Sequence, residues 1–317
     1  MNIQLVTPAP LGINNGNRIT ALRWAAILKK IGHRVQITQD YRDGRCDALI
    51  ALHARRSADS IRRFHELYPE RPLIVVLTGT DLYRDIRSDR QAQRSLELAT
   101  RLVALQSMAL RELPRHVLKK TRVIYQSAEP VKKKPARGDE DFHVCVVAHL
   151  REEKDPLRTA LAVRNLPAPS RIQVTHIGLA LEEKLGARAQ AEAERNPRYR
   201  WIGQRSHAQT RRHLAESKIV CITSKMEGSS NVLSEALAAG VPVIASKISG
   251  LMGTLGDRYA GYFPVGDTAK LRHLLLRAEA DGQFYRRLQR HCARLAELVQ
   301  PRREIEAWRG LLHDLKG

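Results

Sequence analysis

The regular alternation of apolar and amphipathic segments constrains the fold of this chain more than any other feature. Residues 46–53 and 72–79 are apolar runs of strand length, and residues 17–32 form an amphipathic helical segment closed by Gly32. Strands that are apolar along their whole length are typical of parallel sheets with both faces covered. The pattern therefore predicts an α/β fold in which helices flank parallel sheets.

The alternation stops once, at residues 131–141. This stretch, VKKKPARGDED, combines charge, proline and glycine without periodicity, which indicates a linker. We therefore predict two Rossmann-like domains, at 1–130 and 142–300, and a C-terminal helix at 301–317. A crevice is expected at the carboxyl ends of the strands, because open α/β sheets bind ligands there.

Composition narrows the possible compartments. No apolar run approaches the roughly 20 residues that cross a bilayer, and the N-terminus lacks a signal-peptide pattern. The four cysteines, Cys46, Cys145, Cys221 and Cys292, form no CxxC pair, so neither a disulfide framework nor a zinc site is indicated. We expect a cytoplasmic protein.

The net charge of +21, from 54 Lys and Arg against 33 Asp and Glu, indicates an anionic partner. Nucleic acid, an anionic membrane surface and small anionic substrates all fit. The basic residues are spread along the chain, and only 5% of residues are aromatic, which is few for a base-stacking surface. Nucleic acid is therefore the least favoured of the three.

The segment EGSSNVLSEALAAG, residues 227–240, follows an apolar strand at 218–224. Ser229 or Ser230 can cap a helix that runs to Ala239, with Gly240 just after its end. Gly228 and the two serines are small enough for backbone amides to approach a ligand, and the helix dipole favours an anion there. A phosphate group is the expected occupant.

Two acids frame this expected phosphate site. Asn231 and Glu235 are four residues apart and share one helix face, where Glu235 can accept hydrogen bonds from ribose hydroxyls. Glu227, on the loop, lies where a hexose fits. The spacing suits a nucleotide-sugar. A capped helix with two solvent-exposed acids is the simpler alternative.

A second basic loop, VAHLREEKDP at 147–156, follows the first strand of the second predicted domain. Arg151 and Lys154 in this loop can neutralise a departing diphosphate, a task that needs fixed positive charge. An ordinary charged connection between strand and helix is the alternative interpretation.

With these elements, the chain resembles the GT-B glycosyltransferases, in particular the retaining family-4-like group. The shared features are the E-x7-E element from Glu227 to Glu235, the basic loop with Lys154, and GVPVIAS at 240–246. The resemblance covers nearly the whole chain. It implies two Rossmann-like domains facing each other across a crevice, with the last helix crossing back to the first domain.

The resemblance implies site residues, which we name by their roles. The catalytic residues are Lys154, Arg151 and Glu227, and no metal or other cofactor is required. The donor-binding residues are Gly228, Ser229, Ser230, Asn231, Glu235, His149 and Gly16. Two departures stand out: Ala148-His149 replaces the usual Gly-Arg, and Thr78 replaces a common histidine of the first domain.

The narrower resemblance is to the selenosugar synthases of selenoneine biosynthesis. It rests on residues 10–24, 77–86 and 148–156. It implies transfer of a sugar, N-acetylglucosamine by expectation, from a UDP-sugar to selenophosphate, giving a 1-seleno-sugar, UDP and phosphate. A small anionic acceptor suits the polar loop at 8–20, and the expected acceptor-binding residues are Asn15, Asn17, Arg18 and Thr80.

Two other functions stay open. A family-4-like transferase with a lipid-linked or cell-envelope acceptor would use the positive charge to bind anionic lipid. Trp24 and Leu28, beside Lys29 and Lys30, could then form a membrane-docking helix. A nucleic-acid-binding protein is the less favoured alternative.

Overall fold

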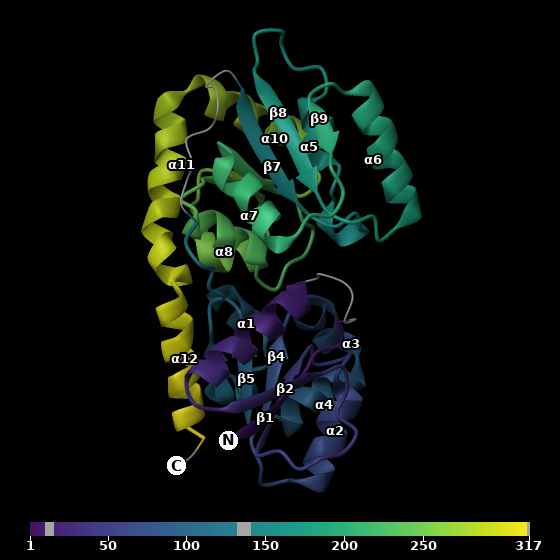
Figure 1. Ribbon diagram of the computed structural model, residues 1–317, viewed down its shortest axis with the longest axis vertical. Coiled ribbons are helices and arrows are strands. Elements are labelled where there is room, and N and C mark those ends of the chain that lie inside the picture. Colours follow the sequence, from purple (N-terminus) through teal and green to yellow (C-terminus); the bar gives the residue numbers. More distant parts are fainter. Residues whose placement is uncertain (10–15, 132–140, 316–317) are drawn as a thin grey trace. The chain divides into compact units, whose positions relative to one another are not determined.

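Two units make up the computed structural model, which describes residues 1–9, 16–131 and 141–315 (Figure 1). The first unit comprises Met1–Gln126, Glu227–Ser230 and Pro301–Gly317, and the second comprises Ser127–Met226 and Asn231–Gln300. Each unit contains one six-stranded sheet, and every strand pair is parallel. The predicted α/β class with two parallel sheets is confirmed. Most of the predicted linker, residues 132–140, lies outside the described residues.

The first sheet has the strand order β2-β1-β3-β4-β5-β6. Its strands are β1 Asn2–Val6, β2 Arg34–Thr38, β3 Ala48–Leu52, β4 Leu73–Leu77, β5 Arg101–Ala104 and β6 Thr121–Val123. The helices of this unit are α1 Gly16–Lys30, α2 Ala58–Leu67, α3 Ile86–Ser88, α4 Arg90–Leu98 and α12 Pro301–His313. A π-helical turn, Asp81–Asp85, and two 3-10 turns, Ser107–Glu112 and Arg115–Lys120, complete it.

Helices cover the first sheet on both faces because its central strands are apolar on both faces. All five residues of β3 and of β4 are buried. On one face Ile50 and Ile74 pack with side chains of α1 and α12, and on the other face Leu49 and Val75 pack with side chains of α2 and α4. Two cores therefore lie on opposite sides of one sheet.

The second sheet has the strand order β12-β11-β10-β7-β8-β9. Its strands are β7 Phe142–Val147, β8 Ile172–Ile177, β9 Tyr199–Trp201, β10 Ile219–Ile222, β11 Val243–Ser246 and β12 Tyr262–Phe263. Its helices are α5 Arg158–Val163, α6 Glu183–Arg195, α7 His207–Glu216, α8 Asn231–Ala238, α9 Ser249–Leu255, α10 Thr268–Ala280 and α11 Gly282–Leu295. Two 3-10 turns lie at Glu152–Lys154 and Ala296–Val299. None of the helices that the structure describes combines the length and apolar character needed to cross a bilayer.

Each strand order changes direction at one place. In the first sheet the neighbours β1 and β3 lead to opposite edges, and in the second sheet β7 and β10 do so. At such a point the two loops that leave the carboxyl ends diverge and leave room for a ligand. The topology therefore selects the loops after β1 and β3 in one unit and those after β7 and β10 in the other.

α12 is joined to α1 by a buried aromatic and ionic contact. The rings of Trp24 and Trp308 meet edge to face with centroids 4.8 Å apart. Glu304, 1% exposed, accepts hydrogen bonds from Trp24 Nε1 at 2.6 Å and Arg23 Nε at 3.1 Å. Trp24 and Leu28 are fully buried, so the membrane-docking role considered for them is wrong.

A buried histidine fixes the start of the loop after β7. His176 on β8 lies 2.9 Å from the Ala148 carbonyl oxygen through Nε2 and 2.7 Å from the Tyr199 hydroxyl through Nδ1. Since the carbonyl only accepts, Nε2 donates, and in the neutral ring Nδ1 then accepts from the Tyr199 hydroxyl. Burial lowers the pKa of His176 from 6.5 to about 4. The backbones that follow β7 and β8 pack closely here. A Cβ on Gly178 would lie only 1.8 Å from the Ala148 oxygen, so glycine is required at 178.

Replacing Glu304 by Ala is expected to destabilise the first unit by about 2–4 kcal/mol, because it leaves the Trp24 and Arg23 donors without their buried acceptor. Denaturant unfolding of the purified chain measures the change. Glu306→Ala is the matched control, since Glu306 lies exposed on the same helix. Equal stability of the two variants would contradict the assigned contact.

The free energy of unfolding is expected to fall between pH 6.5 and pH 4 because of His176. In this window His176 is protonated in the unfolded chain but stays neutral in the folded chain. At about 1.4 kcal/mol per pH unit the loss from this residue reaches about 3 kcal/mol. Denaturation at several pH values, compared with His176→Gln, isolates it. A variant with the same pH slope as the parent would overturn this role.

Candidate functional site

In the second unit, side chains tie together the loops that follow β7 and β10. The Thr223 hydroxyl lies 3.0 Å from the Lys154 carbonyl oxygen and 2.9 Å from that of Asp155. The Lys225 amide donates to the Glu153 carbonyl oxygen at 2.8 Å. The basic loop predicted at 147–156 is therefore fixed beside the end of β10, at the switch point of the sheet.

Lys154 ends a 3-10 turn whose conformation is set by the next residue. Asp155 has a left-handed backbone, with φ 44°, and its carboxylate accepts from Arg158 Nε at 2.8 Å. Arg158 in turn donates to the Thr268 hydroxyl at 2.7 Å. This chain of contacts holds the backbone of Lys154 in place, which is what a fixed positive charge requires.

Arg151 and His149 differ in their hydrogen bonding. The Nε atom of Arg151 is buried and has no hydrogen-bond partner among the residues that the structure describes. A buried donor without a partner is costly, so a bound anion would stabilise it. His149 Nδ1 accepts from the Leu179 amide at 3.1 Å, a bond that joins the loops after β7 and β8. Arg151 is thus the better candidate to replace the family arginine.

Glu235 is buried in the middle of α8. It is 8% exposed, and its Oε1 lies 2.7 Å from His207 Nε2. The alternative in which both acids are solvent-exposed is therefore wrong for Glu235. α8 begins at Asn231, directly after the serines expected to cap it, and ends at Ala238 before Gly240, whose φ is 64°.

Sequence reasoning missed His207. The residue begins α7, whose capping box is formed by Ser206 and Gln209. The S-x-x-Q spacing is a helix-start signal that would have placed His207 on the first turn. Its pairing with Glu235 joins residues 28 positions apart, which the spacing alone does not indicate.

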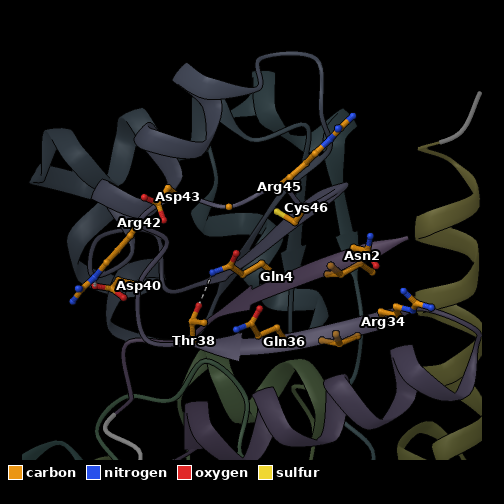
Figure 2. Close-up of a pocket in the computed structure, with 13 residues that line it drawn as sticks. Asn2, Gln4, Arg34, Gln36, Thr38, Asp40, Arg42, Asp43, Arg45 and Cys46 are labelled. Atoms are coloured by element: carbon orange, nitrogen blue, oxygen red, sulfur yellow. Dashed lines mark hydrogen bonds and ion pairs between the residues drawn. The ribbon is translucent and has the colours of Figure 1, made fainter.

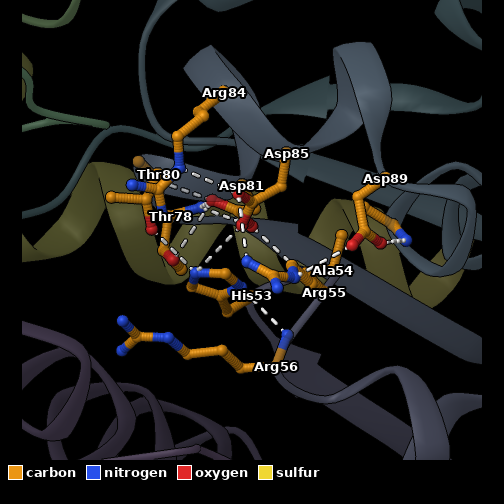
Figure 3. A network of polar contacts seen from close by, with 12 residues as sticks. His53, Ala54, Arg55, Arg56, Thr78, Thr80, Asp81, Arg84, Asp85 and Asp89 are labelled. Carbon is orange, nitrogen blue, oxygen red and sulfur yellow. Dashed lines mark hydrogen bonds and ion pairs between the residues drawn. The ribbon is translucent and has the colours of Figure 1, made fainter.

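In the first unit, one carboxylate joins the loops that follow β3 and β4. Asp81, with no exposed surface, accepts hydrogen bonds from the backbone amides of Ala54 at 3.0 Å, Thr78 at 2.9 Å and Gly79 at 2.8 Å (Figure 3). Thr78, where relatives have a histidine, thus contributes its amide to this network. The LTGTD turn, residues 77–81, therefore connects its own backbone to the loop after β3 through Asp81.

His53, which sequence reasoning also missed, lies in the same network. It is 2% exposed, and its Nε2 lies 2.9 Å from the Thr80 hydroxyl oxygen (Figure 3). Burial lowers its pKa below 6.5. Relatives have a histidine at the position of Thr78, whereas here an imidazole reaches the LTGTD turn from the loop after β3. In the sequence, His53 is simply the last residue of the apolar run at 46–53.

The remaining predicted residues of this unit that the structure describes lie at the start of α1 and after β4. Gly16 is the first residue of α1, and Asn17 and Arg18 follow it, half-buried in the first turn. Asn15 lies outside the described residues. Thr80 is half-buried after β4.

The segment Glu227–Ser230 also groups with the first unit. A Cβ on Gly228 would lie 2.1 Å from the Thr78 carbonyl oxygen and 2.8 Å from the Gly79 nitrogen. Close packing against the backbone of Thr78 and Gly79 therefore requires glycine at 228. From the sequence, we attribute this glycine to the approach of a ligand instead. Glu227 is half-buried, as is Tyr83, whose pKa is raised mainly by burial and then by Glu112, with a smaller contribution from Glu227.

A separate cavity of about 520 Å³ lies on the face of the first sheet beside β1 and β2 (Figure 2). No helix lies between β2 and β3, so the polar side chains of Gln4, Gln36 and Thr38 line it. The Gln4 amide donates to the Thr38 hydroxyl at 3.0 Å, and Arg42 pairs with Asp40 at 3.1 Å. These satisfied polar contacts are those of a solvated sheet face, and no predicted site residue lines the cavity.

Comparisons with known proteins bear on the fold and the family. The structure of HepE from Anabaena with UDP and glucose is 17% identical, with a TM-score of 0.76, and covers 99% of this chain and 100% of that chain. Sucrose-phosphate synthase from Thermosynechococcus elongatus is 17% identical, with a TM-score of 0.76 and coverages of 99% and 98%. These likenesses show the fold, which is GT-B.

A third similar structure, an E. coli protein titled trehalose-6-phosphate and bound with UDP-2-fluoro glucose, is 12% identical with a TM-score of 0.74, covering 100% of this chain and 99% of that chain. No curated protein sequence matches the chain significantly. The family model described as glycosyl transferases group 1 matches residues 127–294, more than half of the chain and most of the second unit. The chain therefore belongs to the group 1 glycosyltransferases.

Proposed function

We propose that this glycosyltransferase takes its sugar from a UDP-sugar, N-acetylglucosamine by expectation, and transfers it to selenophosphate. The observation that carries the donor half is the fixed cationic loop beside β10, in which Arg151 Nε is buried without a partner in the described part of the chain. Similar structures were solved with UDP and glucose or with UDP-2-fluoro glucose, which supports a UDP-sugar as donor. The acceptor half rests on the motifs at 10–24, 77–86 and 148–156.

The donor residues divide by the charge of the group they bind. Arg151 and Lys154 neutralise the diphosphate as the bond to the sugar breaks, since charge develops there in the transition state. The amides at 228–231 add neutral donors to the same oxygens. In this proposal these groups do what a divalent metal ion does in other transferases, so the reaction needs no metal.

The two acids bind neutral hydroxyls. Glu235 accepts from the ribose hydroxyls, and its pairing with His207 at 2.7 Å holds Oε1 in one position so that Oε2 faces a ligand. Glu227 positions the hexose. His149 and Gly16 are the two further residues of the proposed donor-binding set.

The acceptor reaction balances as a substitution followed by a hydrolysis. A selenium lone pair of selenophosphate forms the bond to the anomeric carbon, and the bond from that carbon to the UDP oxygen breaks with its electrons. Water then takes the phosphoryl group, which gives the 1-seleno-sugar and phosphate. The nucleophile is already anionic, so no general base is required. Asn15, Asn17, Arg18 and Thr80 are the proposed acceptor-binding residues.

The second candidate is a family-4-like transferase that uses a lipid-linked or cell-envelope acceptor. Its support is the net charge of +21, which suits an anionic membrane surface. The buried positions of Trp24 and Leu28 remove the docking helix considered for it. Co-sedimentation with anionic vesicles that persists at high salt would favour this candidate.

Product analysis tests the proposal directly. Incubation with a panel of nucleotide-sugars and selenophosphate is expected to give a glycosyl-selenium adduct with a UDP-sugar, detected by mass spectrometry. Donor hydrolysis without an adduct would contradict the selenophosphate acceptor. Turnover with a non-uridine donor alone would contradict the UDP-sugar.

Replacing Lys154 by Ala is expected to lower kcat by about 10²- to 10³-fold, as for the loss of one transition-state donor. Release of UDP, measured in a coupled assay, gives the rate. Lys184→Ala is the control, because Lys184 is exposed on α6. Similar turnover in both variants would refute the role of Lys154.

Replacing His207 by Ala is expected to weaken UDP binding by about 3- to 10-fold, since a freely rotating Glu235 must be ordered when the ribose binds. Isothermal titration calorimetry measures the dissociation constant. The control is His213→Ala on the same helix. If the affinity for UDP is unchanged, the Glu235–His207 pair has only a structural role.

A further inference from the structure

The loop after β3 holds a buried histidine that has no task in the mechanism above. His53 is 2% exposed and has a left-handed backbone, with φ 75°. Such a conformation is uncommon for a residue with a Cβ and persists only where the surroundings fix it. Its position at the β1/β3 switch point is that of a ligand-facing loop.

The surroundings of His53 fix it closely. Its amide donates to the Val76 carbonyl oxygen at 2.8 Å, and its own carbonyl oxygen accepts from the Ser57 amide at 3.0 Å. The Ser57 hydroxyl donates to the Leu52 carbonyl oxygen at 2.7 Å. Next along the chain, the Ala54 amide donates to Asp81 at 3.0 Å. The backbone at His53 is therefore fixed by contacts on both sides.

These contacts also assign the ring proton. The Arg56 amide donates to His53 Nδ1 at 3.2 Å, so Nδ1 carries no hydrogen and the neutral ring carries it on Nε2. The Thr80 hydroxyl oxygen is 2.9 Å from Nε2, whereas the Asp85 carboxylate is 4.0 Å away. His53 therefore donates to Thr80, and its lowered pKa is consistent with a neutral ring.

The Thr80 hydroxyl is left with a hydrogen to donate. Its oxygen accepts from His53, and no acceptor for its own hydrogen is found in the described part of the chain. The guanidinium of Arg56 is exposed and has no ion pair among the described residues, and it extends past the His53 ring in the view of Figure 3. Arg55, by contrast, pairs with Asp89 at 3.0 Å.

We propose that His53 is a positioning residue for the acceptor. Its Nε2–H fixes the Thr80 hydroxyl so that this hydroxyl donates to an anionic oxygen of the acceptor, and Arg56 supplies the nearby positive charge. The inference rests on the proposed function in one respect, that the acceptor is an oxyanion of the selenophosphate class. The hydroxyl gives a directed hydrogen bond to one phosphoryl oxygen, and the guanidinium of Arg56 compensates the charge of the anion.

Conservative variants separate this role from folding. His53→Asn keeps an acceptor for the Arg56 amide and tolerates the left-handed backbone, but it does not reach Thr80. His53→Gln returns an N–H near the position of Nε2. Thr80→Val removes the hydroxyl at constant shape, and Thr80→Ser retains it. His65→Asn, near the far end of α2, is the matched control.

The test is the binding of thiophosphate, a stable analogue of selenophosphate, measured by calorimetry with UDP present. Thr80→Val is expected to raise the dissociation constant about 10-fold or more, and His53→Asn about 3- to 10-fold. The double variant should match Thr80→Val alone, because His53 acts through Thr80. His53→Gln, Thr80→Ser and His65→Asn should stay within about 3-fold of the parent.

The inference is overturned if Thr80→Val or His53→Asn binds thiophosphate with the dissociation constant of the parent. It is also overturned if the two increases in the dissociation constant multiply in the double variant, or if the parent does not bind thiophosphate. Turnover separates the two proposals. Transfer to selenophosphate with an unchanged acceptor KM in His53→Asn would overturn the inference and leave the function intact. Loss of thiophosphate binding in both variants, with no transfer to selenophosphate by the parent, would support the inference and overturn the function.

Discussion

The loops at the carboxyl ends of parallel strands need hydrogen-bond partners that the sheet does not supply. In the first unit the buried carboxylate of Asp81 accepts from three backbone amides on two loops. In the second unit the Thr223 hydroxyl and the Lys225 amide tie the loop after β7 to that after β10. All site residues of either unit depend on such ties for a fixed position, and without them the same side chains would be ordinary surface charges.

Much of the fold follows from local pattern. The buried strands β3 and β4 were visible as apolar runs, and the two ends of α8 were visible from the serines before it and the glycine after it. The position of the basic loop at a strand end also followed, since parallel strands all release their loops at one edge. These features depend on neighbours in sequence, which is why periodicity revealed them.

Three histidine contacts of the two units did not follow from pattern. His53, His176 and His207 contact Thr80, Tyr199 and Glu235, which lie 27, 23 and 28 residues away. A single histidine beside an apolar run gives no sign of such a partner. The reason for glycine at 228 was likewise hidden, because it depends on the approach of the Thr78 backbone. The expectation for Asn15 concerns a residue outside the described ranges.

The departures from the family pattern now have a physical interpretation. Arg151, whose Nε has no partner among the described residues, is the residue we propose in place of the missing family arginine, whereas His149 joins two loops. His53 brings an imidazole to the LTGTD turn from a different strand.

The most direct measurement is a crystal structure of the chain with UDP bound. The account predicts the diphosphate at Arg151 and Lys154 and the ribose hydroxyls on the Glu235 carboxylate. UDP bound elsewhere, or a ribose that makes no contact with Glu235, would contradict it.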